Sequence, residues 1–220
     1  MTEKIKSYWS DDLVVTYDAA RCIHAAECVR GLPGVFDTGK RPWIQPGNAA
    51  ADAVAEVVMR CPTGALHFER KDGGGTEQAP EQNTIRVRDR GPLYLRGDIE
   101  LRLADGAVVR DTRMALCRCG ASQNKPFCDN SHVRIGFSDS GALGENKVRV
   151  LDTVRTAGKL IVTPTPNGSI KVEGDLALSG ADGQTTFEGN RAFLCRCGGS
   201  HNKPFCDSTH KEIGFQADGL

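Results

Sequence analysis

The chain has 220 residues, which suits one or two domains, and it is 39% hydrophobic, 6% aromatic and 25% charged. Its 28 Lys and Arg balance its 28 Asp and Glu, which argues against a polyanion partner, and no apolar run reaches the roughly 18 residues of a membrane helix. The first residues, MTEKIKSYWSDDL, lack the apolar stretch of a secretory signal. We therefore expect a cytoplasmic protein with neither a nucleic-acid nor a membrane partner.

The first 70 residues predict a small α+β unit. Three segments have the composition and periodicity of regular elements: 13–17 (LVVTY) as a strand, 49–60 (AAADAVAEVVMR) as a helix and 65–70 (ALHFER) as a second strand. The following segment, 71–83 (KDGGGTEQAPEQN), is polar and rich in glycine, which is typical of a flexible linker.

The rest of the chain is β-rich and repeats internally, so we predict two modules over 84–150 and 151–220. The segment GDIELRLADG at 97–106 aligns with GDLALSGADG at 174–183. The two copies are offset by 77 residues in this segment and by 78 residues in the cysteine segments, which predicts one additional residue near Glu188. The boundary between the halves should fall within 138–159.

Nine cysteines stand out, because clustered cysteines in a reducing compartment more often bind metal or do redox chemistry than form disulfides. Groups of three suit metal sites better than disulfide pairs. The groups are Cys22, Cys28 and Cys61; Cys117, Cys119 and Cys128; and Cys195, Cys197 and Cys206.

Two of these groups lie in a repeated segment that ends in a histidine. CRCGASQNKPFCDNSH (117–132) and CRCGGSHNKPFCDSTH (195–210) share twelve of sixteen letters and the spacing C-x-C-x8-C-x3-H. Cysteines two apart on an extended strand point to one side, and a Cys and a His four apart share one face of a helical turn, for which Asp129 is the expected N-cap. Two such pairs suit the two irons of a 2Fe–2S cluster, and equally one tetrahedral zinc.

These segments resemble the CDGSH iron–sulfur domain, the family of mitoNEET, whose pattern is C-x-C-x2-S/T-x3-P-x-C-D-G-S/A/T-H. The resemblance spans roughly 84–220, and both copies depart from it only at the glycine, replaced by Asn130 and Ser208. Serine tolerates a left-handed backbone poorly, so the second copy is expected to bend differently or to hold its cluster less firmly. The resemblance implies a 2Fe–2S cluster in each copy, held by three cysteines and one histidine: Cys117, Cys119, Cys128 and His132, and Cys195, Cys197, Cys206 and His210.

That ligand set has consequences for charge and for architecture. Three thiolates around an oxidised core of about +2 give the centre a net charge of roughly −1, whereas four thiolates would give about −2. The less negative centre is easier to reduce. The histidine can also take up a proton, which couples reduction of the centre to pH. The cations within the motifs either offset this charge or are solvated surface residues: Arg118, Lys125, Arg196 and Lys203. Single-motif members of the family resemble intertwined dimers. A tandem chain is therefore expected to form a pseudo-dimer within itself, the alternative being two independent modules.

The first cysteine group resembles a divergent mono-cluster ferredoxin-like domain over roughly 11–70. In the pattern C-x2-C-x2-C with a distant C-P, Cys22 and Cys28 fit the outer positions, Cys61 the distant one, and Ala25 stands at the middle position. Three thiolates suit a 3Fe–4S cluster, whereas a 4Fe–4S cluster needs another ligand, for which His24 is a candidate. The alternative is that these three cysteines bind no cluster.

We find no nucleotide-binding fingerprint and no nucleophile elbow, so we expect no enzyme. The resemblances imply an iron–sulfur protein that exchanges electrons with redox partner proteins. The alternatives are a cluster carrier serving apo-proteins, a redox or pH sensor, and a structural zinc protein.

Overall fold

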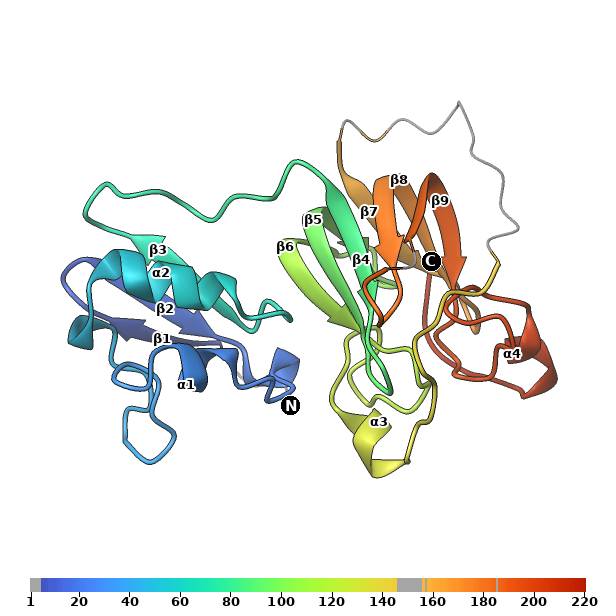
Figure 1. Cartoon of the computed structure of the whole chain (residues 1–220), viewed down its shortest axis with the longest axis horizontal. Helices are drawn as coiled ribbons and strands as arrows, with labels where there is room; N and C mark the ends of the chain where they lie inside the picture. The colour runs from blue at the N-terminus through green and yellow to red at the C-terminus, as the bar shows by residue number, and fades with distance from the viewer. Residues whose placement is uncertain (1–4, 146–155, 157, 185) are drawn as a thin grey trace. The chain divides into compact units, whose positions relative to one another are not determined.

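The computed structural model describes residues 5–145, 156, 158–184 and 186–220. The chain divides into two compact units, Met1–Gln78 and Ala79–Leu220, each with its own sheet and core (Figure 1). The division falls inside the segment predicted to be a linker, and the structure is mixed α and β with short helices, as expected.

The first unit is a three-stranded antiparallel sheet with helices packed beside it. Its elements are β1 (Lys6–Trp9), β2 (Leu13–Tyr17), η1 (Ala19–Arg21), α1 (Glu27–Gly31), η2 (Pro46–Asn48), α2 (Ala51–Met59) and β3 (Leu66–Arg70), with strand order β1-β2-β3. The three predicted elements are confirmed to within two residues. Strand β1 and helix α1 were not predicted, because four and five residues carry too little periodicity to detect.

Helix α2 forms because its apolar residues repeat at helical spacing. Ala51, Val54 and Val58 are spaced three and four apart and are buried, and they pack in one cluster with Val15 and Leu66 of the sheet. The end of this helix leads to Cys61, and strand β2 leads through η1 to Cys22 and on to Cys28 in α1. The packing of α2 on the sheet therefore brings the three cysteines toward one side.

The second unit contains a six-stranded sheet in which the sequence repeat is visible element by element. Its elements are β4 (Asn83–Val87), β5 (Leu93–Arg102), β6 (Val108–Leu116), α3 (Ser131–Arg134), β7 (Leu160–Pro164), β8 (Ile170–Ser179), β9 (Thr186–Leu194) and α4 (Thr209–Glu212). The short strands β4 and β7 correspond, as do β5 and β8, β6 and β9, and α3 and α4. The offset between the halves is 77 up to Ser179, the end of β8, and 78 from Thr186, the start of β9, so the additional residue falls between these two strands in the sequence.

The two halves exchange strand pairing. Strand β4 pairs antiparallel with β5 of its own half and parallel with β8 of the other, while β7 pairs antiparallel with β8 and parallel with β5. Each long strand changes partner at a bulge, at Gly97 (φ 156°) and Gly174 (φ 122°). A Cβ on Gly97 would lie 2.1 Å from Asn83 Oδ1, so no larger residue fits there.

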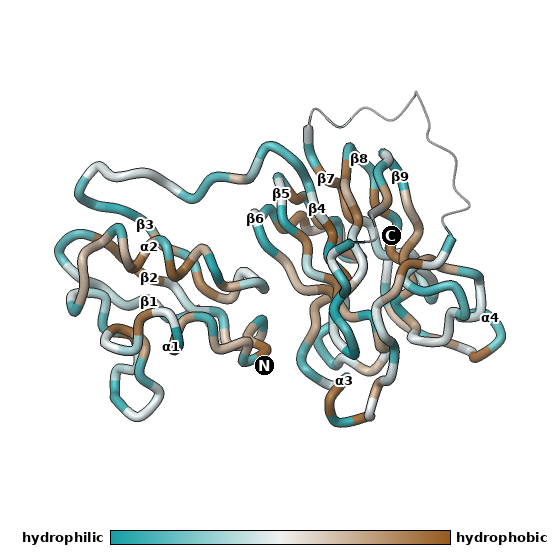
Figure 2. Tube along the Cα trace, in the orientation of Figure 1, coloured by the Kyte–Doolittle hydropathy of each residue, from teal (hydrophilic) through white to brown (hydrophobic). Residues whose placement is uncertain are grey.

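The result is a single core built from both halves. Ile85 and Leu101 of the first half and Val162 and Leu178 of the second are fully buried in one cluster. Figure 2 shows this as hydrophobic colour concentrated along the paired strands. The predicted boundary at 138–159 lies partly outside the described residues, and the compact unit 79–220 contains both predicted modules.

Candidate metal centres

The first repeated motif is built on the end of strand β6. The backbone N–H of Cys117 donates to Pro126 O (2.8 Å), and that of Cys128 donates to Ala115 O (2.9 Å), so the intervening loop folds back along the strand end. The Sγ atoms of Cys117 and Cys119 lie 3.7 Å apart. The two cysteines therefore lie on one side, as their spacing predicts, and their role as ligands stays a prediction.

The second pair of donors lies at the start of helix α3. Cys128 Sγ is 3.4 Å from His132 Nδ1. Asp129 accepts hydrogen bonds from the backbone N–H groups of Ser131 (3.0 Å) and Gln123 (2.8 Å), which, against the opposing effect of burial, lower its pKa. The prediction of Asp129 as the N-cap is one residue off, because Asn130 occupies that position.

The other copy has the same geometry on strand β9 and helix α4. The Sγ atoms of Cys195 and Cys197 are 3.6 Å apart, and Cys206 Sγ lies 3.4 Å from His210 Nδ1. Asp207 accepts hydrogen bonds as Asp129 does, from Thr209 and His201. The repeat in sequence is thus a repeat in donor geometry.

The expectation that the second copy bends differently is wrong. Asn130 has φ 70° and ψ 5°, and Ser208 has φ 74° and ψ 4°. Both residues adopt the left-handed conformation that a glycine would adopt without cost. The fold of the motif imposes this conformation, so serine bears strain there rather than changing the turn.

Ser208→Gly is therefore expected to stabilise the protein by about 0.5–1 kcal/mol. Glycine removes the cost of the left-handed conformation, and part of that gain is lost because glycine gives the unfolded chain more conformational freedom. Asn130→Gly is the matched control and is expected to change stability little, because asparagine tolerates this region. The midpoint of thermal unfolding measures both. Equal shifts for the two variants would contradict this account.

The distances between the donor atoms indicate which kind of metal centre each motif could hold. Two donors bound about 2.0–2.3 Å from one tetrahedral metal lie roughly 3.5–3.8 Å apart, close to the separations within each pair. Among the described residues, no three His, Cys, Asp or Glu side chains lie close enough together to hold one ion. Each motif thus provides two separate two-donor grips, which fits a centre containing two metal ions.

The thiols of each C-x-C pair share a proton that a metal would replace. The hydrogen bond between the sulfurs of Cys117 and Cys119 lowers the pKa of one thiol, which becomes the accepting thiolate, and raises the pKa of the other. In the other copy the hydrogen bond between Cys195 and Cys197 likewise lowers the pKa of one thiol and raises that of the other. One sulfur of each pair is therefore ready to bind a metal ion near neutral pH.

In the Cys/His pairs the pKa shifts come mainly from burial. Burial raises the pKa of Cys128 to about 11 and also raises that of Cys206. Burial, together with the nearby Arg118 guanidinium, lowers the pKa of His132. The imidazole is thus neutral at physiological pH, the form that coordinates metal.

The two motifs touch each other at their C-x-C-G segments. A Cβ on Gly120 would lie 2.4 Å from the carbonyl oxygen of Cys197, and a Cβ on Gly198 would lie 2.6 Å from that of Cys119. Both glycines have positive φ, 82° and 80°. The backbone of each metal-binding segment therefore packs directly against its counterpart, which places the two sites side by side.

The interpretation of the motif cations as solvated surface residues is wrong for the arginines. Arg118 is buried, donates to Gly91 O (2.9 Å) and Arg88 O (2.6 Å), and forms an ion pair with Asp139. Arg196 is buried likewise and donates to Gly168 O (2.9 Å) and Thr165 O (2.6 Å). The two arginines hold their motifs to the β4–β5 turn and to the β7–β8 turn.

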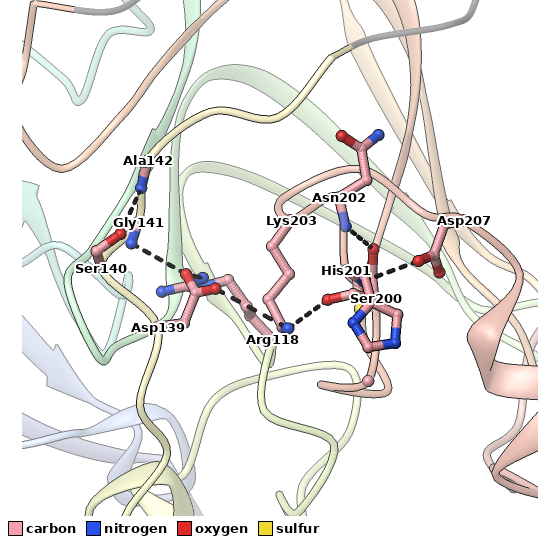
Figure 3. A network of polar contacts seen from close by, with 12 residues as sticks. Arg118, Asp139, Ser140, Gly141, Ala142, Ser200, His201, Asn202, Lys203 and Asp207 are labelled. Atoms are coloured by element: carbon pink, nitrogen blue, oxygen red, sulfur yellow. Dashed lines mark hydrogen bonds and ion pairs between the residues drawn. The ribbon is translucent and has the colours of Figure 1, made fainter.

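The lysines contribute to contacts at the motif loops. Lys203 donates to Ser200 O within its own motif and lies 3.9 Å from Asp139 of the first half (Figure 3). The ammonium of Lys125 lies 6.0 Å from the ring centre of Phe215 in the second half. Both lysines therefore join the two halves close to the sites.

The three cysteines of the first unit line one pocket together with Ala25, Pro62 and Thr63. Burial and the neighbouring Cys61 and Cys22 raise the pKa of Cys28 to about 11, which reflects the proximity of the three thiols. His24 has φ 55° and is exposed, and it lines an adjacent pocket with Cys22 and Cys28 rather than the one that includes Cys61.

Paired thiolate and imidazole donors on loops of small β-rich units define a protein of metal-binding domains. Residues 8–71 match the family described as a divergent 4Fe-4S mono-cluster, and residues 90–133 and 167–211 match the iron-binding zinc finger of CDGSH type. The chain therefore belongs to the proteins that combine a divergent 4Fe-4S mono-cluster domain with two CDGSH-type iron-binding modules.

Its curated relatives include the uncharacterized protein YjdI of Escherichia coli strains K12 and O157:H7. Each is 33% identical over 66 residues, which cover 30% of this chain and 87% of the relative. No solved structure matches the chain. In the part of the chain that the structure describes, no helix is both long and apolar enough to cross a membrane.

Proposed function

We propose that this protein transfers single electrons through two 2Fe–2S centres and a third iron–sulfur centre. The first 2Fe–2S centre is bound by Cys117, Cys119, Cys128 and His132, and the other by Cys195, Cys197, Cys206 and His210. The observation that carries the proposal is the arrangement of two two-donor grips in each motif, with the motifs in backbone contact at Gly120 and Gly198. When bound, each such centre supplies one-electron redox chemistry.

The chain's residues have distinct roles in this proposal. The C-x-C pair grips one metal ion and the Cys/His pair the other, while the buried Arg118 and Arg196 fix the loops and offset negative charge near them. The pairing of β4 with β8 and of β5 with β7 supports an intramolecular pseudo-dimer, in which the relative placement of the sites would not depend on a second chain. Rapid electron exchange between two sites requires that the distance between them be short and fixed.

The third centre is assigned to Cys22, Cys28 and Cys61. These thiols share a pocket, which supports one common cluster rather than three unrelated residues. The family description favours 4Fe–4S, whereas three thiolates alone suit 3Fe–4S. A 4Fe–4S centre would need a fourth ligand besides these thiols, and the exposed His24 lies in the adjacent pocket with Cys22 and Cys28.

Cys61→Ser is expected to remove the signal of the third centre from the EPR spectrum and to leave the two 2Fe–2S signals unchanged, because the two units have separate cores. Iron content should fall by the share of one cluster. The matched control is Thr63→Val, which alters the same pocket without removing a ligand. Retention of every signal in Cys61→Ser would contradict the assignment.

A cluster carrier is the second candidate, and a half-buried His210 beside an open pocket favours it. The partners are then apo-proteins rather than redox proteins. Reversible reduction with all iron retained supports electron transfer, whereas movement of iron and sulfide to an apo-ferredoxin supports the carrier. No enzymatic activity is proposed.

A further inference from the structure

A larger pocket lies beside the three-cysteine site of the first unit. It has a volume of about 460 Å³, within the range of small-molecule sites, which is roughly 300–1,000 Å³. Cys22 and Cys28 line it but Cys61 does not, whereas all three cysteines line the smaller pocket assigned to the third centre. A cluster bound by all three thiols therefore leaves the larger pocket available to another molecule. We call it the aromatic pocket, after Tyr8, Tyr17 and Trp43 in its lining.

The three rings of the aromatic pocket come from separate parts of the fold. Tyr8 belongs to β1, Tyr17 ends β2, and Trp43 lies in the loop before η2. Trp43 meets Tyr17 edge to face, with 4.9 Å between ring centres and 80° between planes, and meets Tyr8 at 6.4 Å and 76°. The buried Phe36 supports Trp43 from the core, with ring centres 6.2 Å apart. The rings are thus held in place without a ligand, and a preorganised aromatic surface suits a flat aromatic molecule.

The charge of the aromatic pocket is positive. Among the described residues that line it, Lys6 and Arg41 are cations and none is Asp or Glu. Lys6 is the cross-strand partner of Tyr17, so the two side chains share one face of the sheet. Arg41 is fixed by hydrogen bonds from its Nη1 to the carbonyl oxygens of Thr38 (2.9 Å) and Lys40 (2.7 Å). Both cations are exposed, so they suit an anionic group in contact with water, while the rings suit an apolar body.

The aromatic pocket shares a wall with the site of the third centre. Tyr17, Cys22, Cys28 and Trp43 line both pockets. A molecule in the aromatic pocket would therefore contact the same side chains that surround the cluster. This arrangement provides the short separation that electron exchange between the two requires.

We propose that the aromatic pocket binds a small, flat aromatic anion that exchanges electrons with the third centre, an inference that rests on the proposed function. One electron moves between them: the partner that gives it up is oxidised and the other is reduced, with no covalent bond formed. The cations select an anionic group, such as a phosphate or a sulfonate, over a neutral molecule. Flavin mononucleotide and anthraquinone sulfonate both have this chemistry.

The test is the binding of these two anions to the anaerobic full-length protein, measured by equilibrium dialysis and, for the flavin, by loss of its fluorescence. Riboflavin has the same rings as flavin mononucleotide without the phosphate, and inorganic phosphate has no ring. We expect at least one aromatic anion to bind more tightly than riboflavin, and phosphate to bind most weakly. Tighter binding of the flavin nucleotide indicates a flavin as the natural ligand, and tighter binding of the sulfonate indicates a quinone.

Arg41→Gln and Lys6→Gln are each expected to weaken binding of the anion about two- to fivefold, the effect of losing one exposed charge, and to leave riboflavin binding unchanged. The matched control is Lys40→Gln, which should bind like the parent. Lys40 is an exposed cation next to Arg41, but it pairs with Asp37 at 3.5 Å and does not line the pocket.

Trp43→Leu is expected to weaken both the nucleotide and riboflavin roughly tenfold, because it removes the central ring. An unchanged EPR signal of the third centre would show that the first unit of this variant is folded. If the signal is lost, the two charge variants decide the question, because their side chains are exposed.

A bound anion should also shift the EPR signal of the third centre in the parent, since Cys22 and Cys28 line both pockets. The inference would be overturned if neither aromatic anion binds a protein with full iron content. Equal affinity of the parent and the double variant of Lys6 and Arg41 would overturn it as well. A protein that binds the anion but contains no third cluster would instead count against the proposed function.

Discussion

Gly120→Ala and Gly198→Ala are each expected to destabilise the second unit by about 3 kcal/mol or more. Overpacking costs about 1–3 kcal/mol, and a left-handed alanine adds about 1–2 kcal/mol. The added methyl group would meet backbone atoms of the opposite motif, which cannot move without shifting a metal-binding cysteine. Since domains are stable by only about 5–15 kcal/mol, this is a large fraction.

The measurement is loss of visible absorption during urea unfolding. Gly106→Ala is the matched control, because Gly106 has φ 83° but open space around it, so that variant bears the conformational cost without the clash. Gly120→Ala should unfold at clearly lower urea than Gly106→Ala. Superimposable curves for the two variants would show that the motifs do not pack as described.

Replacing both His132 and His210 with cysteine is expected to lower the midpoint potentials by on the order of 100 mV or more, because each centre gains a negative charge. In the parent, reduction raises the proton affinity of the imidazole, so the potential falls as pH rises through the range in which the reduced state holds a proton. The double variant has no such proton and its potential should vary less with pH.

Titration of the parent and the double variant at several pH values measures both effects. His201→Gln serves as the control, since His201 is exposed and its backbone, not its ring, contacts Asp207. The control should follow the parent at each pH. If the curves of the double variant overlay those of the parent, histidine is not a ligand that couples electrons to protons.

The candidate ligands could be predicted from sequence because their signal is local. Cysteines two apart and a Cys four before a His define their pairs almost without tertiary information, and the observed contacts of 3.4–3.7 Å follow. The strand exchange could not be predicted in this way. The pairing of β4 with β8 joins residues some 90 positions apart, and nothing in either short strand indicates its second partner.

Two features of the sequence could not be interpreted correctly without the structure. Gly97 and Gly174 stand in a repeated GD dipeptide, yet their role at a bulge appears only when both partner strands are known. Arg118 and Arg196 looked like surface charges, because burial of a guanidinium depends on carbonyl groups 27 and 28 residues away. Asp139, the ion-pair partner of Arg118, was missed for the same reason.

EPR together with iron, sulfide and zinc analysis of anaerobically purified protein tests the central claim most directly. The account predicts a red-brown protein with iron and sulfide in the ratio required by two 2Fe–2S centres and one further cluster, and with two distinguishable reduced 2Fe–2S signals. A colourless protein with stoichiometric zinc and negligible iron would contradict it.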